Sequence, residues 1–390
     1  MNLNKEFLNY YLILIWCTPF FIWSFLGGHK QILFGINTDH IATALACLAS
    51  LLVLLVNFKM NKSIFNVIIL YSGYLFLAFI SIFYIDAPSD AVYIYITQFV
   101  YFFITIFLSV FFSKNQDLFF KIITRAALLS AAIILLSFLL FGISSWGRMT
   151  IPVYIDGHFL YFPKGYSSSS DPNVLAYFLS IGFLSSFFYK KNNKRWFISL
   201  LIIFSALLLT ASRSALVALV MAILVYFLLT FNFKIKVKYL IGVIALAFPV
   251  TFSLLLYLYN EGLLRLKSAA SDSDRMERLL HAKSLIFESI PTFVFGKGIG
   301  YSRAIIDPHN FYLSSVIDTG FISLILIFST LIFVVVAIAK RYKEKHIFAY
   351  VVSLITFFML ISLFYWQVRT YYFIIMILLV VCCSSKPQKY

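Results

Sequence analysis

One histidine stands out as a residue that could carry chemistry. His309 follows Asp307 and Pro308 directly before a long apolar stretch, and Asp followed by Pro is typical of a helix start. We therefore expect Asp307 to be the N-cap and His309 to lie in the first helical turn. The positive end of a helix disfavours an imidazolium ion, so a neutral His309 could accept a proton as a general base. A hydrogen-bonded packing histidine is the alternative.

Two arginines lie at other predicted helix ends. Arg213 lies between two very apolar stretches, where an ionised residue is costly and often functional. Its alternative role is to reach lipid headgroups. Asp274 and Arg275 predict a second helix start, with Asp274 as N-cap and an end near Ile290. The guanidinium group of Arg275 in the first turn would suit a phosphate, while pairing with Asp272 or with headgroups is the alternative.

Three further residues are candidate substrate-binding residues. Arg278 follows Arg275 on the same predicted helix, Asn310 follows His309, and Arg148 lies in another long loop, which is rich in aromatic residues. Aromatic rings suit stacking on sugars, although an aromatic belt at a membrane interface is the commoner cause. The sequence shows no His-Glu-x-x-His motif, no Ser-His-Asp spacing and no carboxylate cluster. We therefore predict a reaction that uses no metal and no cofactor.

The elements that must position these residues are membrane helices. Hydrophobic residues make up 62% of the 390 and charged residues only 12%, a balance that a water-soluble core does not need. A transmembrane helix requires about 20 mainly apolar residues. The apolar stretches predict an all-α integral membrane protein of about twelve transmembrane helices, at 7–26, 40–57, 64–84, 91–112, 122–142, 172–189, 196–211, 214–231, 239–258, 310–339, 347–366 and 370–383.

The basic residues predict the orientation of these helices. Placing both termini in the cytoplasm puts 19 of the 31 lysines and arginines on the inner side, as the positive-inside rule expects. Topology then accounts for the whole net charge of +16. The basic composition is therefore no argument for nucleic-acid binding, which would require a basic face on a soluble surface.

The whole chain, 1–390, is expected to be one polytopic membrane domain with two long extracytoplasmic loops. These are 143–171 and 259–309, and the second, between the ninth and tenth helices, carries the candidate active site. Long ordered loops are uncommon unless they have a function. Within 259–309, apolar side chains recur every three to four residues and predict an amphipathic helix at the outer membrane interface. The residues at this spacing, one of them a lysine, are Met276, Leu279, Leu280, Lys283, Phe287 and Ile290.

The order of these motifs resembles the O-antigen ligase and polymerase family, membrane enzymes that transfer glycans from undecaprenyl diphosphate outside the inner membrane. The most specific part is His309-Asn310 followed by nine residues and Gly320. Ligases usually have Gly, Thr or Tyr where this chain has Ser323. The other matching parts are Asp-Pro-Asn at 171–173, Ala-Ser-Arg-Ser-Ala at 211–215, Asp-Arg at 274–275 and the stretch 291–300.

The resemblance implies an all-helical glycosyltransferase of the C type in the bacterial inner membrane, with a periplasmic active site. Arg213 and Arg275 resemble the arginines that hold the donor diphosphate, and His309 resembles the base that activates the acceptor hydroxyl. The implied partners are an undecaprenyl-diphosphate-linked oligosaccharide, membrane lipid and a chain-length regulator protein. The reaction would be a metal-independent inverting transfer.

Three functions are compatible with this organisation. A polymerase adds the glycan to a lipid-linked repeat unit, and a ligase adds it to lipid A-core. Ser323 and the Phe-, Tyr-, Ile- and Lys-rich composition favour the polymerase. A flippase for lipid-linked oligosaccharides would also have about twelve helices, but would need charges along a central cavity, whereas here they concentrate in an outer loop.

Overall fold

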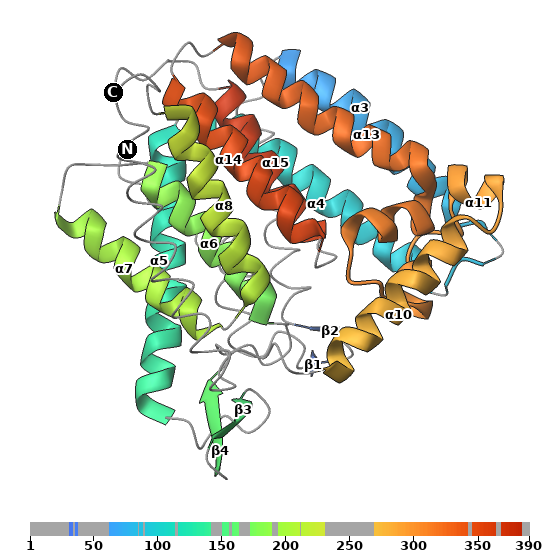
Figure 1. Cartoon of the computed structure of the whole chain (residues 1–390). Helices are drawn as coiled ribbons and strands as arrows, with labels where there is room; N and C mark the ends of the chain where they lie inside the picture. The colour runs from blue at the N-terminus through green and yellow to red at the C-terminus, as the bar shows by residue number, and fades with distance from the viewer. Residues whose placement is uncertain are drawn as a thin grey trace.

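The computed structural model of the chain is mainly helical in the part that it describes (Figure 1). It describes residues 31–33, 36–37, 62–84, 86–88, 90–113, 116–141, 150–155, 158–163, 172–188, 194–210, 212–230, 269–341, 345–363 and 368–383.

The long helices follow the apolar stretches of the sequence. They are α3 (Lys62–Ser81), α4 (Ala91–Phe112), α5 (Gln116–Phe141), α6 (Pro172–Phe188), α7 (Lys194–Leu209), α8 (Arg213–Thr230), α13 (Phe311–Arg341), α14 (Lys345–Ser362) and α15 (Val368–Cys383). They correspond to nine of the twelve predicted helices, and the predicted helices 7–26, 40–57 and 239–258 lie outside the described residues. Among the described helices, α3, α4, α13 and α14 are long and apolar enough to cross a membrane.

Two predicted loop regions contain secondary structure of their own. The large loop includes the helices α10 (Ala269–Ile286), α11 (Ile290–Phe295) and α12 (Tyr301–Ile305). The first long loop includes an antiparallel pair, β3 (Thr150–Ile155) and β4 (His158–Pro163), and a second pair, β1 (Gln31–Leu33) and β2 (Ile36–Asn37), lies near the N-terminus. These short hairpins depart from the all-α prediction. Asp156-Gly157 between β3 and β4 is a hairpin signal that the prediction overlooked.

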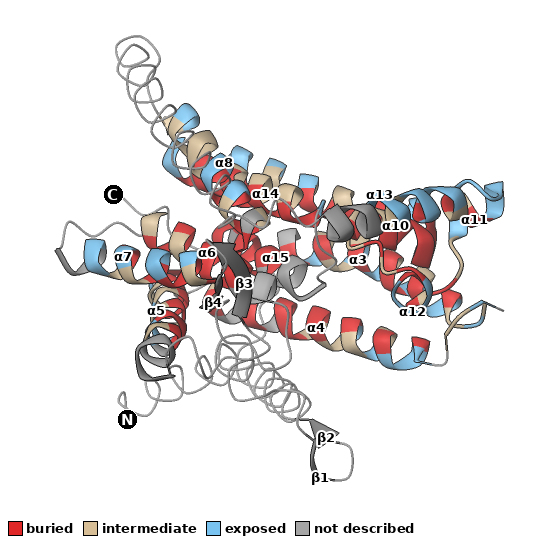
Figure 2. Ribbon diagram, turned by 60° about the horizontal axis from the view of Figure 1, so that its bottom comes forward, coloured by how far each residue is buried: buried red, intermediate tan, exposed pale blue. Residues whose placement is uncertain are grey.

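Antiparallel packing places the starts of α6 and α8 at the same end as the finish of α14. The Tyr226 hydroxyl, near the end of α8, lies 3.4 Å from His346 Nδ1 at the start of α14. Ser185, near the end of α6, contacts the Tyr350 hydroxyl at 2.9 Å. Figure 2 shows buried residues on the inner faces of these helices and exposed ones on their outer faces.

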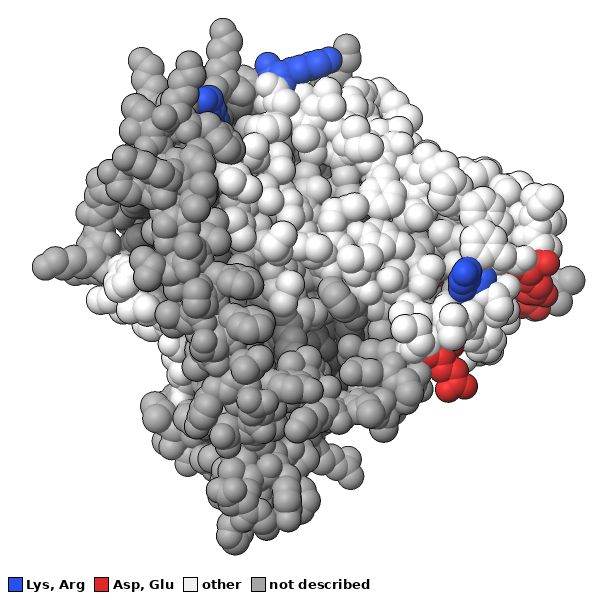
Figure 3. All heavy atoms as spheres, in the orientation of Figure 1, with Lys and Arg blue, Asp and Glu red and all other residues white. Residues whose placement is uncertain are grey.

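The surface is divided as expected for a membrane protein. Large apolar side chains such as Phe76, Phe197, Val217 and Ile332 are more than half exposed, which suits contact with lipid chains. On the face shown in Figure 3, basic side chains lie along the upper edge, where α13 ends and α14 begins. Acidic side chains, with a basic one beside them, lie near α10 and α11, and the described surface between these and the upper edge is uncharged.

Candidate active site

Asn310 caps the helix α13. Its Oδ1 accepts the backbone N–H groups of Tyr312 and Leu313, both at 3.0 Å, and so satisfies two donors of the first helical turn. Its Nδ2 donates to the carbonyl oxygen of Leu363 at 3.1 Å, just past the end of α14. Asn310 is therefore buried and fixes the start of α13 against α14.

The predicted helix start at Asp307 is wrong. α13 begins at Phe311, so His309 precedes the N-cap and is outside the first turn. The backbone φ angles of Asp307 and His309 are 40° and 49°, in the left-handed region that few residues other than glycine adopt. Asp and His are among the side chains that tolerate it best, and such strain is concentrated at functional sites.

His309 and Asp307 form a pair just outside the helix. The Asp307 Oδ1 atom lies 3.3 Å from His309 Nδ1 and also accepts the His309 backbone N–H at 3.4 Å. The side chain of His309 is 36% exposed and that of Asp307 is 42% exposed, so a substrate can reach them. A carboxylate beside Nδ1 favours the tautomer with its proton on Nδ1, so that Nε2 is the nitrogen able to accept a proton.

Arg278 approaches the same segment from α10. Its Nη1 donates to the carbonyl oxygen of Ile306 at 3.4 Å, one residue before Asp307. The structure thus brings Arg278 to the segment that carries His309, three residues after Ile306.

Gly320 divides α13 into two helices. Its φ of 84° and ψ of 170° lie in a region that is essentially restricted to glycine. A Cβ atom there would collide with the backbone of α11, at 2.5 Å from the carbonyl carbon of Val294 and 2.6 Å from Phe295 Cα. The motif His309-Asn310, nine residues, Gly320 therefore has a physical meaning, because the nine residues are the short helix between the Asn310 cap and the break.

Because α13 is broken at Gly320, two of its carbonyl groups accept hydrogen bonds from the large loop instead of from the helix itself. The backbone N–H of Lys297 donates to the carbonyl of Ile317 at 2.7 Å, and that of Gly298 donates to the carbonyl of Asp318 at 3.0 Å. In an uninterrupted helix these carbonyls would accept N–H groups four residues further on. The glycines of this loop, at 296, 298 and 300, all have positive φ. Gly296 lies against the backbone of Asp318 and Thr319 in α13, whereas Gly298 lies against Ala87 and Gly300 against Ile94 of α4.

Asp318 fixes the next part of the loop. It is 4% exposed, and its Oδ1 accepts the backbone N–H of Ser302 at 2.7 Å in the first turn of α12. The Gly300 N–H and the Ser302 hydroxyl also hydrogen-bond to this carboxyl group. A carboxyl group buried in an apolar helix is costly unless it has such partners, so Asp318 is the polar anchor of α12.

We expect Asp318→Asn to destabilise the protein by about 1–2 kcal/mol, because an amide group in place of a carboxyl oxygen would face the donors of Ser302 and Gly300. The measurement is the thermal midpoint of the purified protein in detergent. Asp117→Asn, at an exposed position on α5, is the matched control. Equal midpoints for the two variants would contradict the anchoring role of Asp318.

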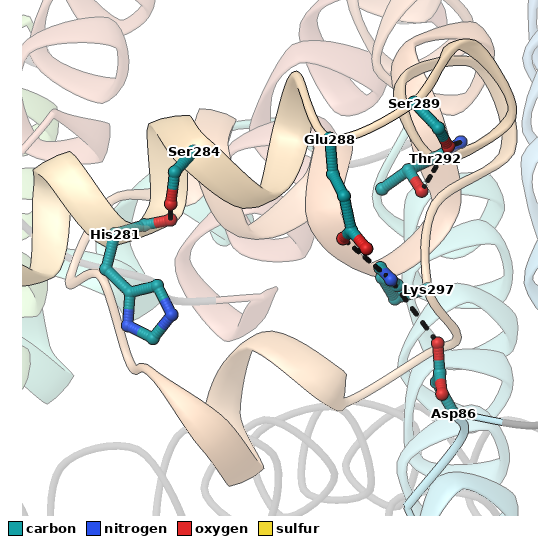
Figure 4. A network of polar contacts seen from close by, with 7 residues as sticks. All are labelled: Asp86, His281, Ser284, Glu288, Ser289, Thr292 and Lys297. Atoms are coloured by element: carbon teal, nitrogen blue, oxygen red, sulfur yellow. Dashed lines mark hydrogen bonds and ion pairs between the residues drawn. The ribbon is translucent and has the colours of Figure 1, made fainter.

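Lys297 joins the large loop to the connection between α3 and α4 (Figure 4). Its Nζ lies 2.8 Å from Glu288 Oε2 and 3.5 Å from Asp86 Oδ2. The hydrogen bond to Glu288, aided by the charges of Glu288 and Asp86, raises the pKa of Lys297 above its ordinary value. Nearby, the backbone N–H of Ile299 donates to Ser81 Oγ at 3.1 Å. The loop is therefore supported by the end of α3 and by the connection from α3 to α4.

The helix predicted to run from Asp274 to Ile290 differs at both ends. α10 begins at Ala269, so Arg275 lies in the second turn, and neither the Asp274 cap nor the first-turn position of Arg275 is correct. α10 ends at Ile286, because Ser289 caps the new helix α11 by accepting the backbone N–H of Thr292 at 3.2 Å. The first turn of α10, before Asp274, lies in a stretch with few apolar residues, so the apolar pattern does not reveal it.

The other arginines are placed only in part. Arg213 is the first residue of α8, one residue before the predicted start at 214, and its neighbour Ser214 contacts the Tyr177 hydroxyl of α6 at 3.3 Å. Because α8 and α14 are antiparallel, this end of α8 is at the same end of the bundle as Leu363, which holds Asn310. Side-chain contacts of Arg213 and Arg275 lie outside what the structure describes, as does Arg148 altogether.

Sequence reasoning assigned no role to Asp318 and took Gly320 only as part of a motif. An ionisable residue inside an apolar helix is a signal in its own right, and it could have identified Asp318. In the described part of the chain, no three His, Cys, Asp or Glu residues are grouped in a way that could hold a metal ion.

Comparison with known proteins gives one result for this region. A family model described as O-antigen ligase matches residues 197–328, which span α7, α8, α10, α11, α12 and the first half of α13. No curated protein matches the chain. The matched stretch includes Arg213, Arg275, Arg278, His309 and Gly320.

Proposed function

We propose that this membrane protein, whose residues 197–328 match the O-antigen ligase family model, is a polymerase of O-antigen or a related surface polysaccharide. It joins repeat units that are linked to undecaprenyl diphosphate, at the periplasmic face of the bacterial inner membrane, with both termini in the cytoplasm. Its partners are the lipid-linked oligosaccharide, membrane lipid and a chain-length regulator protein.

The observation that carries this proposal is the His309–Asp307 pair beside Arg278. The Nδ1 atom of His309 lies 3.3 Å from Asp307, and Arg278 donates to the carbonyl of the residue before Asp307. A histidine oriented by a carboxylate is the usual arrangement for a general base. A guanidinium group near that base suits an anionic leaving group.

The proposed reaction is a single inverting displacement. His309 Nε2 takes the proton of an acceptor sugar hydroxyl, and the oxygen forms a bond to the anomeric carbon of the donor. The bond from that carbon to the diphosphate breaks, and undecaprenyl diphosphate leaves with the electron pair. Asp307 stabilises the imidazolium ion that forms, while Arg213, Arg275 and Arg278 stabilise the charge on the leaving group.

A ligase that transfers the glycan to lipid A-core is the second candidate, favoured by the description of the matching family. Ser323 does not help to decide between the two. Its side chain is fully buried, and its Oγ donates to the carbonyl of Thr319 at 2.8 Å across the break in α13. Ser323 is therefore explained by the packing of the helix rather than by the choice of acceptor.

The surface glycan of a deletion strain tests the proposal. Loss of a polymerase is expected to leave lipopolysaccharide capped with single repeat units. Complete absence of O-antigen from the core, with lipid-linked polymer accumulating, would replace the polymerase by the ligase. An unchanged glycan profile would contradict both functions.

We expect Arg213→Lys and Arg275→Lys each to lower activity about 10–100-fold, because lysine keeps the charge but lacks the guanidinium fork for phosphate oxygens. Activity is measured as chain length in cells at matched expression and as transfer rate with purified protein. Arg303→Lys is the control, since Arg303 is exposed on α12. Near-normal chain length in both test variants would disprove the diphosphate-binding role.

A further inference from the structure

The helix α10, with the two residues that follow it and continue its turn, Phe287 and Glu288, has three distinct faces. One face is buried against α13, where Ala282 and Ile286 pack with Val316 and Ile317. A second face is polar and exposed, and consists of Glu277, His281, Ser284 and Glu288. The third face is apolar and also exposed: its residues are Met276, Leu280 and Phe287, which are 57%, 59% and 68% exposed.

The three apolar residues share one stripe of the helix. Residues 276, 280, 283 and 287 are separated by four, three and four positions, which places them on one side at 3.6 residues per turn. Lys283 is the basic member of this stripe, and its long side chain can reach past the apolar surface to a polar layer. We call Met276, Leu280, Lys283 and Phe287 the α10 stripe.

The α10 stripe continues onto the membrane-facing surface of α13. The ring of Phe287 stacks on Phe293 of α11 at a centroid distance of 5.9 Å, and Phe293 stacks on Phe321 of α13 at 5.0 Å. Ile290 and Phe295 of α11 are 80% and 49% exposed beside this ladder. The exposed apolar surface thus runs without interruption from a helix able to span the membrane to the large loop.

The break in α13 indicates where this exposed apolar surface lies relative to the hydrocarbon core of a membrane. The second half of α13, residues 321–341, has 21 residues and is about 31 Å long at 1.5 Å per residue. That length matches a hydrocarbon core of about 30 Å, whereas the whole of α13 would exceed it. Gly320 therefore marks the outer edge of the hydrocarbon, and α10 packs on α13 at residues 316 and 317, next to that edge.

We propose that α10 and α11 lie in the outer membrane interface, with the α10 stripe, Ile290 and Phe295 in contact with lipid. The partner is the lipid bilayer itself. The apolar groups enter the acyl boundary, Lys283 lies at the headgroup phosphates, and the polar face of α10 points to water. His309 and Arg278, held by the same loop, are thereby kept at the level of the headgroups, where a lipid-linked diphosphate lies.

Spin labels on neighbouring positions of α10 test this contact. Leu280→Cys and His281→Cys are made in a chain without native cysteines, labelled with a nitroxide, and placed in nanodiscs of phosphatidylethanolamine and phosphatidylglycerol. Collision with oxygen, which enters lipid, and with a neutral nickel chelate, which stays in water, is then measured. We expect the oxygen-to-nickel ratio to be several-fold higher at position 280 than at 281.

Two results would overturn the proposal. Dominant collision with nickel at both positions would mean that the stripe faces water. Low collision with both reagents at position 280 would mean that a second copy or another protein covers it. Met276→Cys and Glu277→Cys are a second matched pair, so one poorly folded variant does not decide the outcome. No glycan donor is needed, and the result is therefore independent of the proposed reaction.

Discussion

His309→Ala is expected to lower the rate of glycan transfer about 10²–10⁴-fold while leaving the protein folded, because general-base assistance typically contributes that much. His309 makes contacts with Asp307 at the rim of the site and is 36% exposed, so few packing contacts depend on it. His309→Gln should be nearly as slow, since glutamine can hydrogen-bond to the acceptor hydroxyl but cannot take its proton. The assay uses purified protein with lipid-linked repeat units.

The matched control for this prediction is His281→Ala. His281 lies on the exposed polar face of α10, and its ring lies apart from the ion pairs around Lys297 (Figure 4), so its loss should change the rate little. Asp307→Asn should lie between the two, because asparagine still accepts a hydrogen bond from Nδ1 but stabilises the imidazolium ion less. Full activity of His309→Ala would remove the base assignment. Loss of wild-type activity on adding chelator would replace the scheme by a metal-assisted one.

The membrane helices were predictable because the bilayer makes one simple demand on the sequence. Each span needs about 20 apolar residues whatever its neighbours are. The span-length helices α3 and α4 and the shorter apolar helices α6 and α8 begin and end within two to three residues of their predicted bounds. α5 begins six residues early, at Gln116 rather than at 122. Polar residues at a helix end do not change the hydropathy pattern, so that pattern cannot locate the end.

Helix starts in the outer segments were not predictable from local signals, because several residues compete to be the cap. Asp307 followed by Pro308 is the stronger local signal, yet Asn310 is the cap. The choice depends on a contact 53 positions away, since Asn310 also donates to Leu363. Asp307 instead accepts from His309, and the local rule failed at the residues proposed for catalysis.

The division of α13 was hidden for a similar reason. The sequence from 311 to 339 is mainly apolar, and hydropathy does not register a backbone break. A glycine within a helical pattern is compatible with both a continuous and a broken helix. The conformation of Gly320 is decided by α11, whose backbone lies against it, and this contact appears only in the folded chain.

Gly320→Ala is accordingly expected to abolish most activity and to lower the thermal midpoint strongly. Alanine at this φ and ψ costs about 1–3 kcal/mol in backbone strain alone. In addition its Cβ would meet the backbone of Val294 and Phe295 at 2.5–2.6 Å, where no flexible side chain can move away. α11 would have to separate from α13, and the loop that carries Arg278 and His309 would move with it. Thermal midpoint and chain length in cells are the two measurements.

Gly73→Ala separates this effect from the general cost of replacing a glycine. Gly73 lies in α3 and faces α13, but a Cβ there would meet only the side chain of Leu326, with Cδ1 at 3.4 Å and Cδ2 at 3.8 Å. Alanine is also the better helix former, so Gly73→Ala should be as stable as the wild type or more so.

If Gly320→Ala is folded but inactive, the break itself is needed to place His309. If it is stable and active like Gly73→Ala, α13 is not broken at Gly320, and the bilayer level that we derive from that break is wrong as well.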